Sequence, residues 1–267
     1  MCSSDLLRAW QRIARAGRAP TADNAVTLLA ALRVAPSDTL AGRMAVTLAQ
    51  TVRNSQAADG MWTMPAGTAL DVSLAETCRA VWALGPDNQA NRLRATGAIE
   101  RQRARLASPW LAAWALAADV ADPGEVESLR KIVRDALTTH ADGSKTFQVD
   151  ATRWDGFRVR EAESTAVAIL ALPKDDPLRA DLATGLLTAY RPSTGFGDGW
   201  IGLLAMRALD EVFAGEIPRE VSIVVSIDGV EAGRAVLASK QPHAPVRVLA
   251  PALVGPAEHQ VTDRKST

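Results

Sequence analysis

The residues GFGDGWIGLLAMRAL at positions 195–209 decide how this chain is expected to fold. They join a glycine-rich turn and two aromatic side chains to a helix that is apolar on nearly all sides. Glycine lets the backbone turn tightly, with positive φ where needed, and a large aromatic ring can fill the end of a helix bundle beside the turn. The stretch therefore predicts a buried helix that begins next to a tight turn.

The same combination occurs twice more in the chain. Residues 56–84 read QAADGMWTMPAGTALDVSLAETCRAVWAL, and residues 142–172 read DGSKTFQVDATRWDGFRVREAESTAVAILAL. Each stretch has a glycine-rich turn with an aromatic residue, followed by a helix rich in alanine and leucine. Repeats of this kind bury a continuous core only by stacking on their neighbours. The sequence therefore predicts an internal repeat in which each unit packs on the next.

Two kinds of predicted helix alternate along the chain. Helices that are apolar on nearly all sides must be buried on all sides, whereas amphipathic helices keep one face in water. The alternation predicts an inner layer of helices packed within an outer layer. The expected fold is mainly α, an α/α toroid of helical hairpins, complete or partial. The predicted inner helices are AVTLLAAL (25–32), TCRAVWAL (77–84), PWLAAWAL (109–116), TAVAILAL (165–172) and GLLAMRAL (202–209).

Helix boundaries follow from capping residues. EVESLRKIVRDALT at 125–138 has a single apolar face, and Asp122 is expected to cap this helix. Asp175 and Asp176 stand directly before Pro177, which is a favoured first residue of a helix. We interpret this acidic pair as a helix cap rather than as catalytic acids.

The pattern changes after Pro218 to a period of two, which is typical of strands. Residues 221–227 alternate in this way, and Asp228-Gly229 is a strong hairpin signal that leads into a second strand. Val246, Val248 and Leu253 are expected to continue as strand, and the polar residues 259–267 are expected to fray. The predicted domains are a helical domain at 1–217 and a β segment at 218–267 that forms part of a β-sandwich module.

Composition excludes several classes of protein. Lys plus Arg and Asp plus Glu number 30 each, so the net charge is zero and no electrostatic grip on nucleic acid or an anionic membrane is expected. The arginines between 92 and 105 are interpreted as a solvated helix face. Two cysteines exclude a disulfide scaffold, and no apolar run is long enough for a membrane span. The N-terminus lacks the apolar core of a signal peptide.

Few residues are candidates for chemistry. Glu76, Glu161 and Glu163 are the acids that could form a carboxylate pair in the mouth of a toroid, but acids near helix N-termini are also favoured by the helix dipole. Ser164 and Ser193 lack the context of a serine nucleophile. The tryptophans could line a ligand cavity, although the core is their more frequent place. They are Trp62, Trp82, Trp110, Trp114, Trp154 and Trp200.

No metal or cofactor site is predicted. His140, His243 and His259 have no spacing that joins them to one another or to Cys78. No catalytic, cofactor-binding or metal-binding residue is therefore predicted, and the chain is expected not to be an enzyme.

GFGDGWIGLLAMRALDEVF (195–213), followed by EVSIVVSIDGVEAGRAVL (220–237), resembles the bacterial α2-macroglobulin family. In that family a Gly-Phe-Gly turn and an apolar helix close the thioester-containing helical domain, and β strands follow directly. SPWLAAWAL (108–116) and ESTAVAILAL (163–172) also resemble helices of that domain. The similarity covers about residues 20–250. QAADGMW (56–62) is similar to a turn of terpenoid cyclases, which share the α/α-toroid fold with prenyltransferase β subunits.

The resemblance implies a part in protease inhibition by entrapment. The family's thioester requires a Cys-x-Glu-Gln motif, yet the residue three positions after Cys2 is Asp5 and the one three positions after Cys78 is Val81. The expected function is therefore that of a thioester-less scaffold module of an α2-macroglobulin-like endopeptidase inhibitor. The implied partners are proteases, through the parent trap, and neighbouring β modules. The implied compartment is periplasmic or extracellular.

Two alternatives remain open. One is a toroid-group enzyme acting on an isoprenoid or a polysaccharide, although the zinc set of prenyltransferases and the Asp-x-Asp-Asp motif of cyclases are absent. The other is a repeat-type binding scaffold with no inhibitory role. An enzyme needs converging acids in a deep aromatic cavity, whereas a trap module is expected to have a filled centre.

Overall fold

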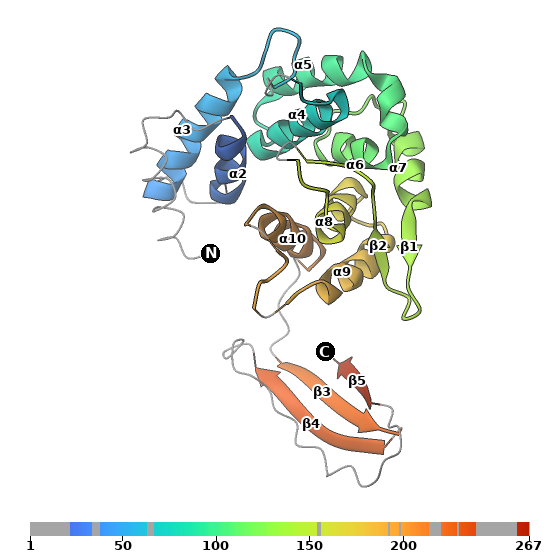
Figure 1. Ribbon diagram of the computed structural model, residues 1–267. Helices are drawn as coiled ribbons and strands as arrows, with labels where there is room; N and C mark the ends of the chain where they lie inside the picture. The colour runs from blue at the N-terminus through green and yellow to red at the C-terminus, as the bar shows by residue number, and fades with distance from the viewer. Residues whose placement is uncertain are drawn as a thin grey trace. The chain divides into compact units, whose positions relative to one another are not determined.

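The chain forms two compact units, Met1–Phe213 and Ala214–Thr267. The structure is a computed structural model, drawn in Figure 1. The prediction of a mainly α protein is confirmed, because nine α-helices lie in the part of the chain that the structure describes. That part comprises residues 22–33, 38–62, 67–153, 156–191, 193–197, 199–213, 220–228, 230–238 and 261–266.

The helical unit alternates helices with short turns and hairpins. Its elements, in chain order, are α2 (Ala22–Leu32), α3 (Leu40–Asn54), α4 (Leu70–Leu84), α5 (Gln89–Glu100), a 3₁₀ turn (Arg103–Ala107), α6 (Pro109–Ala117), α7 (Val126–Asp135), β1 (Leu137–Thr139), β2 (Lys145–Phe147), α8 (Glu161–Ala171), α9 (Leu178–Thr188) and α10 (Gly199–Val212).

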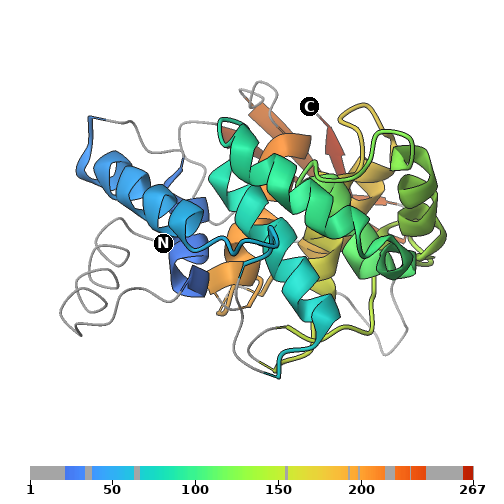
Figure 2. The same cartoon turned by 90° about the horizontal axis from the view of Figure 1, so that it is seen from above.

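The even-numbered helices form the inner layer of this unit. Each packs on the next, in the order α2, α4, α6, α8 and α10, and α10 also contacts α2. Figure 1 shows α3, α5, α7 and α9 on the outside of the inner helices. Figure 2 shows α3 lying against α2, and each of the other outer helices likewise contacts the inner helix before it. The two layers that the alternation of helix types predicted are therefore present.

Three inner helices are buried on all sides, as predicted. Trp110–Ala115 of α6 and Ala162–Ile169 of α8 are buried without interruption, and so is Thr77–Val81 of α4. The prediction is wrong for α10, because Met206 on its outer side is 61% exposed. Among the described residues α10 has neighbours on only part of its circumference, which leaves this side uncovered.

The predicted helix at 125–138 is shorter than its apolar pattern. It begins at Val126, and Asp122 caps a turn before it by accepting a hydrogen bond from the backbone N–H of Gly124 at 2.7 Å. It ends at Asp135, and the next residues, Leu137–Thr139, pair with β2 as strand β1. The β-branched Thr138 and Thr139 suit this strand, and tertiary pairing overrides the helical periodicity.

A tight hairpin precedes each of α4, α8 and α10. The glycine-rich turn of each sequence repeat forms this hairpin. Gly60, Gly143 and Gly195 turn these hairpins with φ of 89°, 83° and 63°. In the first two turns, Asp59 and Asp142 each accept a hydrogen bond at 3.0 Å from the backbone N–H two residues later. The Asp-Gly pair therefore builds the same Asx turn in both repeats.

The aromatic residue that follows each of these two turns is fastened to the next inner helix. The backbone N–H of Trp62 donates to Thr77 Oγ1 at 3.2 Å, and that of Phe147 donates to Thr165 Oγ1 at 3.0 Å. Both rings are buried. In both repeats a buried aromatic residue before the helix is thus hydrogen-bonded to a buried threonine hydroxyl within the helix.

The second unit is a three-stranded antiparallel sheet. Its strands are β3 (Glu220–Ile227), β4 (Val230–Ala238) and β5 (Val261–Ser266), in the order β4-β3-β5. The predicted hairpin at 221–237 is confirmed, with a register shift between Val225 and Ser226. The expected strand residues Val246, Val248 and Leu253 lie outside the described residues.

The expectation that residues 259–267 fray is wrong for Val261–Ser266. This segment pairs with β3 over six residues, from Ser222↔Ser266 to Ile227↔Val261. Val261 and Thr262 favour extended backbone.

Candidate functional site

Four tryptophans gather where the inner helices meet. Trp114 of α6 lies at ring-centroid distances of 6.3 Å from Trp82, 6.3 Å from Trp200 and 5.7 Å from Trp110. Trp82 and Trp200 are 6.1 Å apart and nearly perpendicular. Trp110, Trp114 and Trp200 are buried, and Trp82 is half-buried. Edge-to-face and stacked packing of this kind fills space and stabilises the core beyond simple burial.

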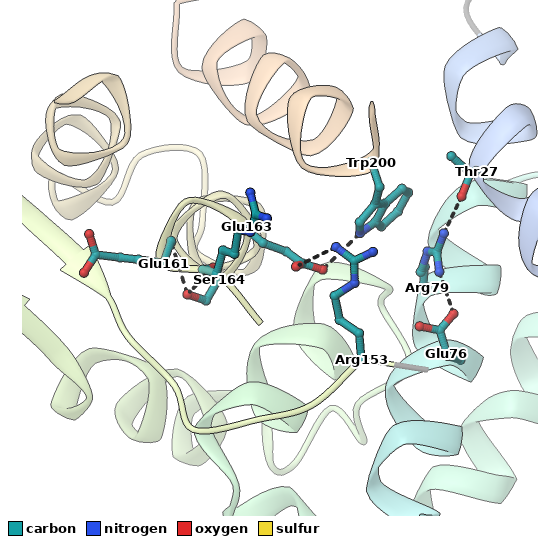
Figure 3. A network of polar contacts seen from close by, with 9 residues as sticks. Thr27, Glu76, Arg79, Arg153, Glu161, Glu163, Ser164 and Trp200 are labelled. Atoms are coloured by element: carbon teal, nitrogen blue, oxygen red, sulfur yellow. Dashed lines mark hydrogen bonds and ion pairs between the residues drawn. The ribbon is translucent and has the colours of Figure 1, made fainter. Parts of the chain in front are cut away.

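Two arginine–glutamate pairs lie beside Trp200 (Figure 3). Arg79 Nη1 is 2.8 Å from Glu76 Oε2, and the Arg79 guanidinium sits 3.9 Å from the centroid of the Trp200 ring. Arg153 Nη1 is 3.6 Å from Glu163 Oε2, and Trp200 Nε1 donates to Glu163 Oε1 at 3.1 Å. Trp200 therefore joins the two pairs, since it contacts the cation of one and the anion of the other.

This network links elements that are distant in the sequence. Arg79 of α4 donates through Nη2 to Thr27 Oγ1 of α2, while its cation lies over Trp200 of α10. Glu163 of α8 binds Trp200 from the other side. Four of the five inner helices are thus cross-linked by buried polar contacts. Such networks are favourable only when every charge has a partner, and they then fix one arrangement of the core.

The described side chains of this network enclose a small cavity. Its volume is about 10 Å³, which is the room that one water molecule needs. Its lining includes both acids of the network, Glu76 and Glu163, together with their arginines and Trp110. Among the described residues, two charge-paired acids thus surround a space for about one water molecule, an arrangement that can brace the helices.

A larger, open pocket adjoins the small cavity. Its volume is about 340 Å³, and it shares Val72, Trp110 and Thr152 with the inner cavity. Its acids are Asp71 and Asp150, which are exposed and pair with Arg105 at 3.4 Å and with Arg158 at 3.2 Å. This pocket lies at the N-terminal ends of α4 and α6.

The three acids considered as glycosidase candidates separate into two groups. Glu76 and Glu163 line the same small cavity. Glu161 is exposed, and in Figure 3 its side chain points away from the network. Glu161 and Glu163 lie in the first turn of α8, where acids are stabilised by the helix dipole.

The remaining candidate residues have local structural contacts. Ser164 Oγ donates to Phe147 O and so fastens a hairpin to α8. His140 is exposed and shares a 2.9 Å hydrogen bond with Thr146. Asp176 Oδ1 accepts from the backbone N–H of Leu178 at 3.0 Å, as a helix-capping residue does. Ser193 is exposed. Cys2, Trp154, His243 and His259 lie outside the described residues.

Cys78 is a fully buried free thiol within α4. Burial raises the pKa of this thiol to about 12, because the thiolate loses its hydration. The thiolate is the nucleophilic form of cysteine, so Cys78 is poorly suited to act as a nucleophile at neutral pH.

The arginines between 92 and 105, expected to form a solvated face, have fixed partners. Arg94 and Arg101 donate to the backbone carbonyls of Ala57 and Asp59 in the first hairpin. Arg92 pairs with Asp119 at 2.7 Å. Arg94, Arg101, Arg103 and Arg105 are exposed, so this face is solvated as predicted. Its contacts also fasten α5 and its C-terminal turn to the hairpin and the loop beside them.

The two arginines at the centre, Arg79 and Arg153, were not among the predicted site residues. Arg79 stands alone in the otherwise apolar helix TCRAVWAL, and a single cation in such a helix must find a buried partner. That signal was available. Arg153 had no comparable signal, because it lies in a loop and reaches Glu163 only through the tertiary fold.

No protein-family model matches the sequence, and a search of curated proteins finds no similar protein. In the described parts of the chain, no three His, Cys, Asp or Glu side chains gather where they could hold a metal ion. None of the described helices has the length and apolar character that crossing a bilayer requires.

Proposed function

We propose that the helical unit is an α/α toroid that serves as a scaffold module and performs no chemistry. The observation that carries the proposal is the filled centre. Tryptophans and two arginine–glutamate pairs occupy the place where toroid enzymes would need a cavity, and about 10 Å³ is left between them.

The order of helix contacts supports a ring. Each inner helix packs on the next, and the last of them, α10, contacts the first, α2. The proposed toroid therefore has five inner helices with the odd-numbered helices outside them. The resemblance to the α2-macroglobulin family independently implies the same architecture.

The proposed parent protein is an α2-macroglobulin-like protease trap, located outside the cytoplasm. Trapping requires modules that move relative to one another while each stays rigid. The cross-linked centre provides such rigidity. Neither Cys2 nor Cys78 stands in a Cys-x-Glu-Gln motif, and Cys78 is buried, so thioester capture is not proposed for this chain.

A toroid-group enzyme is the second candidate, and one observation favours it. The open pocket of about 340 Å³ at the N-terminal ends of α4 and α6 is large enough for a small ligand. Its two acids, however, are exposed and paired with arginines, which does not provide the desolvated carboxylate that general acid catalysis needs.

Protease trapping and hydrolysis can be separated in one experiment. The DNA upstream of Met1 is read for a longer coding sequence, and the gene product and this chain are each incubated with trypsin. A trap blocks cleavage of a protein substrate but spares a small peptide substrate. We expect this pattern for the longer product and no inhibition by this chain alone. Turnover of a polysaccharide or an isoprenoid diphosphate by the chain would contradict the scaffold assignment.

A further inference from the structure

The open pocket at the N-terminal ends of α4 and α6 has no part in the scaffold function proposed above. Its volume of about 340 Å³ lies within the range of small-ligand sites, and every residue that lines it belongs to the described part of the chain. Three segments that are distant in the sequence meet there, namely the starts of α4 and α6 and the loop 150–152 before α8. The pocket is therefore a product of the tertiary fold.

Two hydroxyl groups in this pocket form no hydrogen bond among the described residues. Ser108 stands at the N-cap position of α6, where a serine commonly accepts a hydrogen bond from the first turn, yet its side chain makes no such bond. Thr152 also lines the pocket, and its exposed side chain has no hydrogen-bond partner in the described structure. Because a hydroxyl can both donate and accept, each of the two is available to a ligand.

The same pocket offers strong acceptors and further donors. Its acids Asp71 and Asp150 are exposed, and each is paired with one exposed arginine, Arg105 at 3.4 Å and Arg158 at 3.2 Å. Exposed ion pairs of this kind contribute little, so both carboxylates remain able to accept hydrogen bonds from a ligand. The first turns of α4 and α6 add backbone N–H groups that have no partner within their helices and no side-chain cap.

The charges of the pocket favour a neutral ligand. Its lining contains two carboxylates and no basic side chain, so an anion is repelled. A cation would have to displace Arg105 and Arg158 from the acids and would face the positive ends of two helix dipoles. Val72, Leu111 and Ala151 supply apolar surface between the polar groups. A neutral molecule with several hydroxyl groups on a carbon ring matches both kinds of lining.

We propose that this pocket binds a neutral sugar, held by Asp150, Thr152 and Ser108, and performs no chemistry on it. Each sugar hydroxyl donates one hydrogen bond and accepts others, so it is satisfied by a carboxylate on one side and a hydroxyl or a free N–H on the other. The C–H groups of the ring can lie on the apolar surface of Val72 and Leu111. The inference does not depend on the scaffold function, because it rests on the pocket and not on the filled centre.

A ligand-observed NMR titration of the full chain tests the site. Methyl α-D-glucoside and methyl α-D-galactoside are the probes, because they differ only in the orientation of one hydroxyl group. We expect saturable binding of at least one of them, a measurable preference between the two, and no release of methanol. Asp150→Asn should weaken the binding at least about tenfold, because the ligand loses a charged acceptor.

Matched variants keep the result interpretable. Asp119→Asn removes the charge of an exposed acid that pairs with Arg92 beyond the C-terminal end of α6, and it should bind like the wild type. Thr152→Val keeps the shape of the side chain without its hydroxyl and should bind more weakly, which covers the case in which Asp150→Asn fails to fold.

Three results would overturn the proposed site. They are that neither glycoside binds, that succinate or putrescine binds and the glycosides do not, and that the folded Asp150 and Thr152 variants bind as the wild type does. Release of methanol from a bound probe would support the site but would contradict the scaffold function, so the two proposals can fail separately.

Discussion

At the scale of single residues, two charged side chains in apolar helices have opposite surroundings. Arg79 is 4% exposed, yet it has a carboxylate, a hydroxyl and an aromatic face as partners. Arg207 has a buried Nη2 and no ion pair among the described residues. The sequence marks both positions as unusual, but it cannot tell them apart, because the partners come from other helices.

Cys78 provides a prediction at this scale. In a Cys2→Ser variant, Cys78 is the one remaining thiol. Its raised pKa of about 12 keeps the thiol protonated below that pH, and its burial blocks access. A thiol-specific reagent at about pH 8 should therefore leave the native protein unlabelled and label it fully in guanidinium chloride. Ser193→Cys in the same background is the exposed control. Rapid labelling of native Cys78 would mean that α4 opens readily.

At the scale of elements, the repeat could be predicted and the ends of the helices could not. The Asp-Gly turns, the buried ring after each turn and the apolar helix are properties of adjacent residues, so the sequence reveals them. The end of α7 at Asp135 depends on the pairing of Leu137–Thr139 with β2, and the strand Val261–Ser266 depends on β3. Pairing between distant segments leaves little mark on local periodicity.

Alanine substitutions at two helical glycines test whether β2 packs closely on α9. A Cβ atom at Gly185 of α9 would lie 2.0 Å from the carbonyl oxygen of Lys145 in β2, whereas one at Gly202 of α10 would meet nothing within 4 Å. Gly202→Ala should stabilise the protein by up to about 1 kcal/mol through helix propensity. Gly185→Ala should destabilise it by about 2 kcal/mol, because β2 must move away. Chemical denaturation measures both. Equal effects would contradict the close packing of β2 on α9.

At the scale of the whole molecule, the alternation of apolar and amphipathic helices predicted the two layers. Which side chains fill the space between the inner helices could not be predicted, because Glu163, Trp200 and Arg153 come into contact only in the tertiary structure. The same tryptophans would suit a ligand cavity or a packed core, and only their mutual distances and the small remaining volume distinguish the two.

The two compact units give a prediction for proteolysis. Because Met1–Phe213 and Ala214–Thr267 each form a compact unit, trypsin should cut at Arg219, between Phe213 and Glu220, and leave a resistant helical fragment. Mass mapping identifies the cut, and circular dichroism of the fragment should show mostly helix, with a smaller β contribution than that of the whole chain, because only β1 and β2 remain in it. Digestion of both units at the same rate, with no intermediate fragment, would contradict the prediction that the helical unit resists trypsin.

The free energy of unfolding of the Glu163→Gln variant tests most directly whether the centre braces the helices. The substitution keeps an acceptor for Trp200 but removes the charge that faces Arg153. Loss of one partner of a buried ion pair predicts a loss of about 3 kcal/mol. Glu161→Gln, at the exposed neighbour on the same helix turn, should change stability by less than about 0.5 kcal/mol. A Glu163→Gln variant as stable as the wild type, or more stable, would contradict the bracing role, because residues kept for catalysis or ligand binding commonly lower stability.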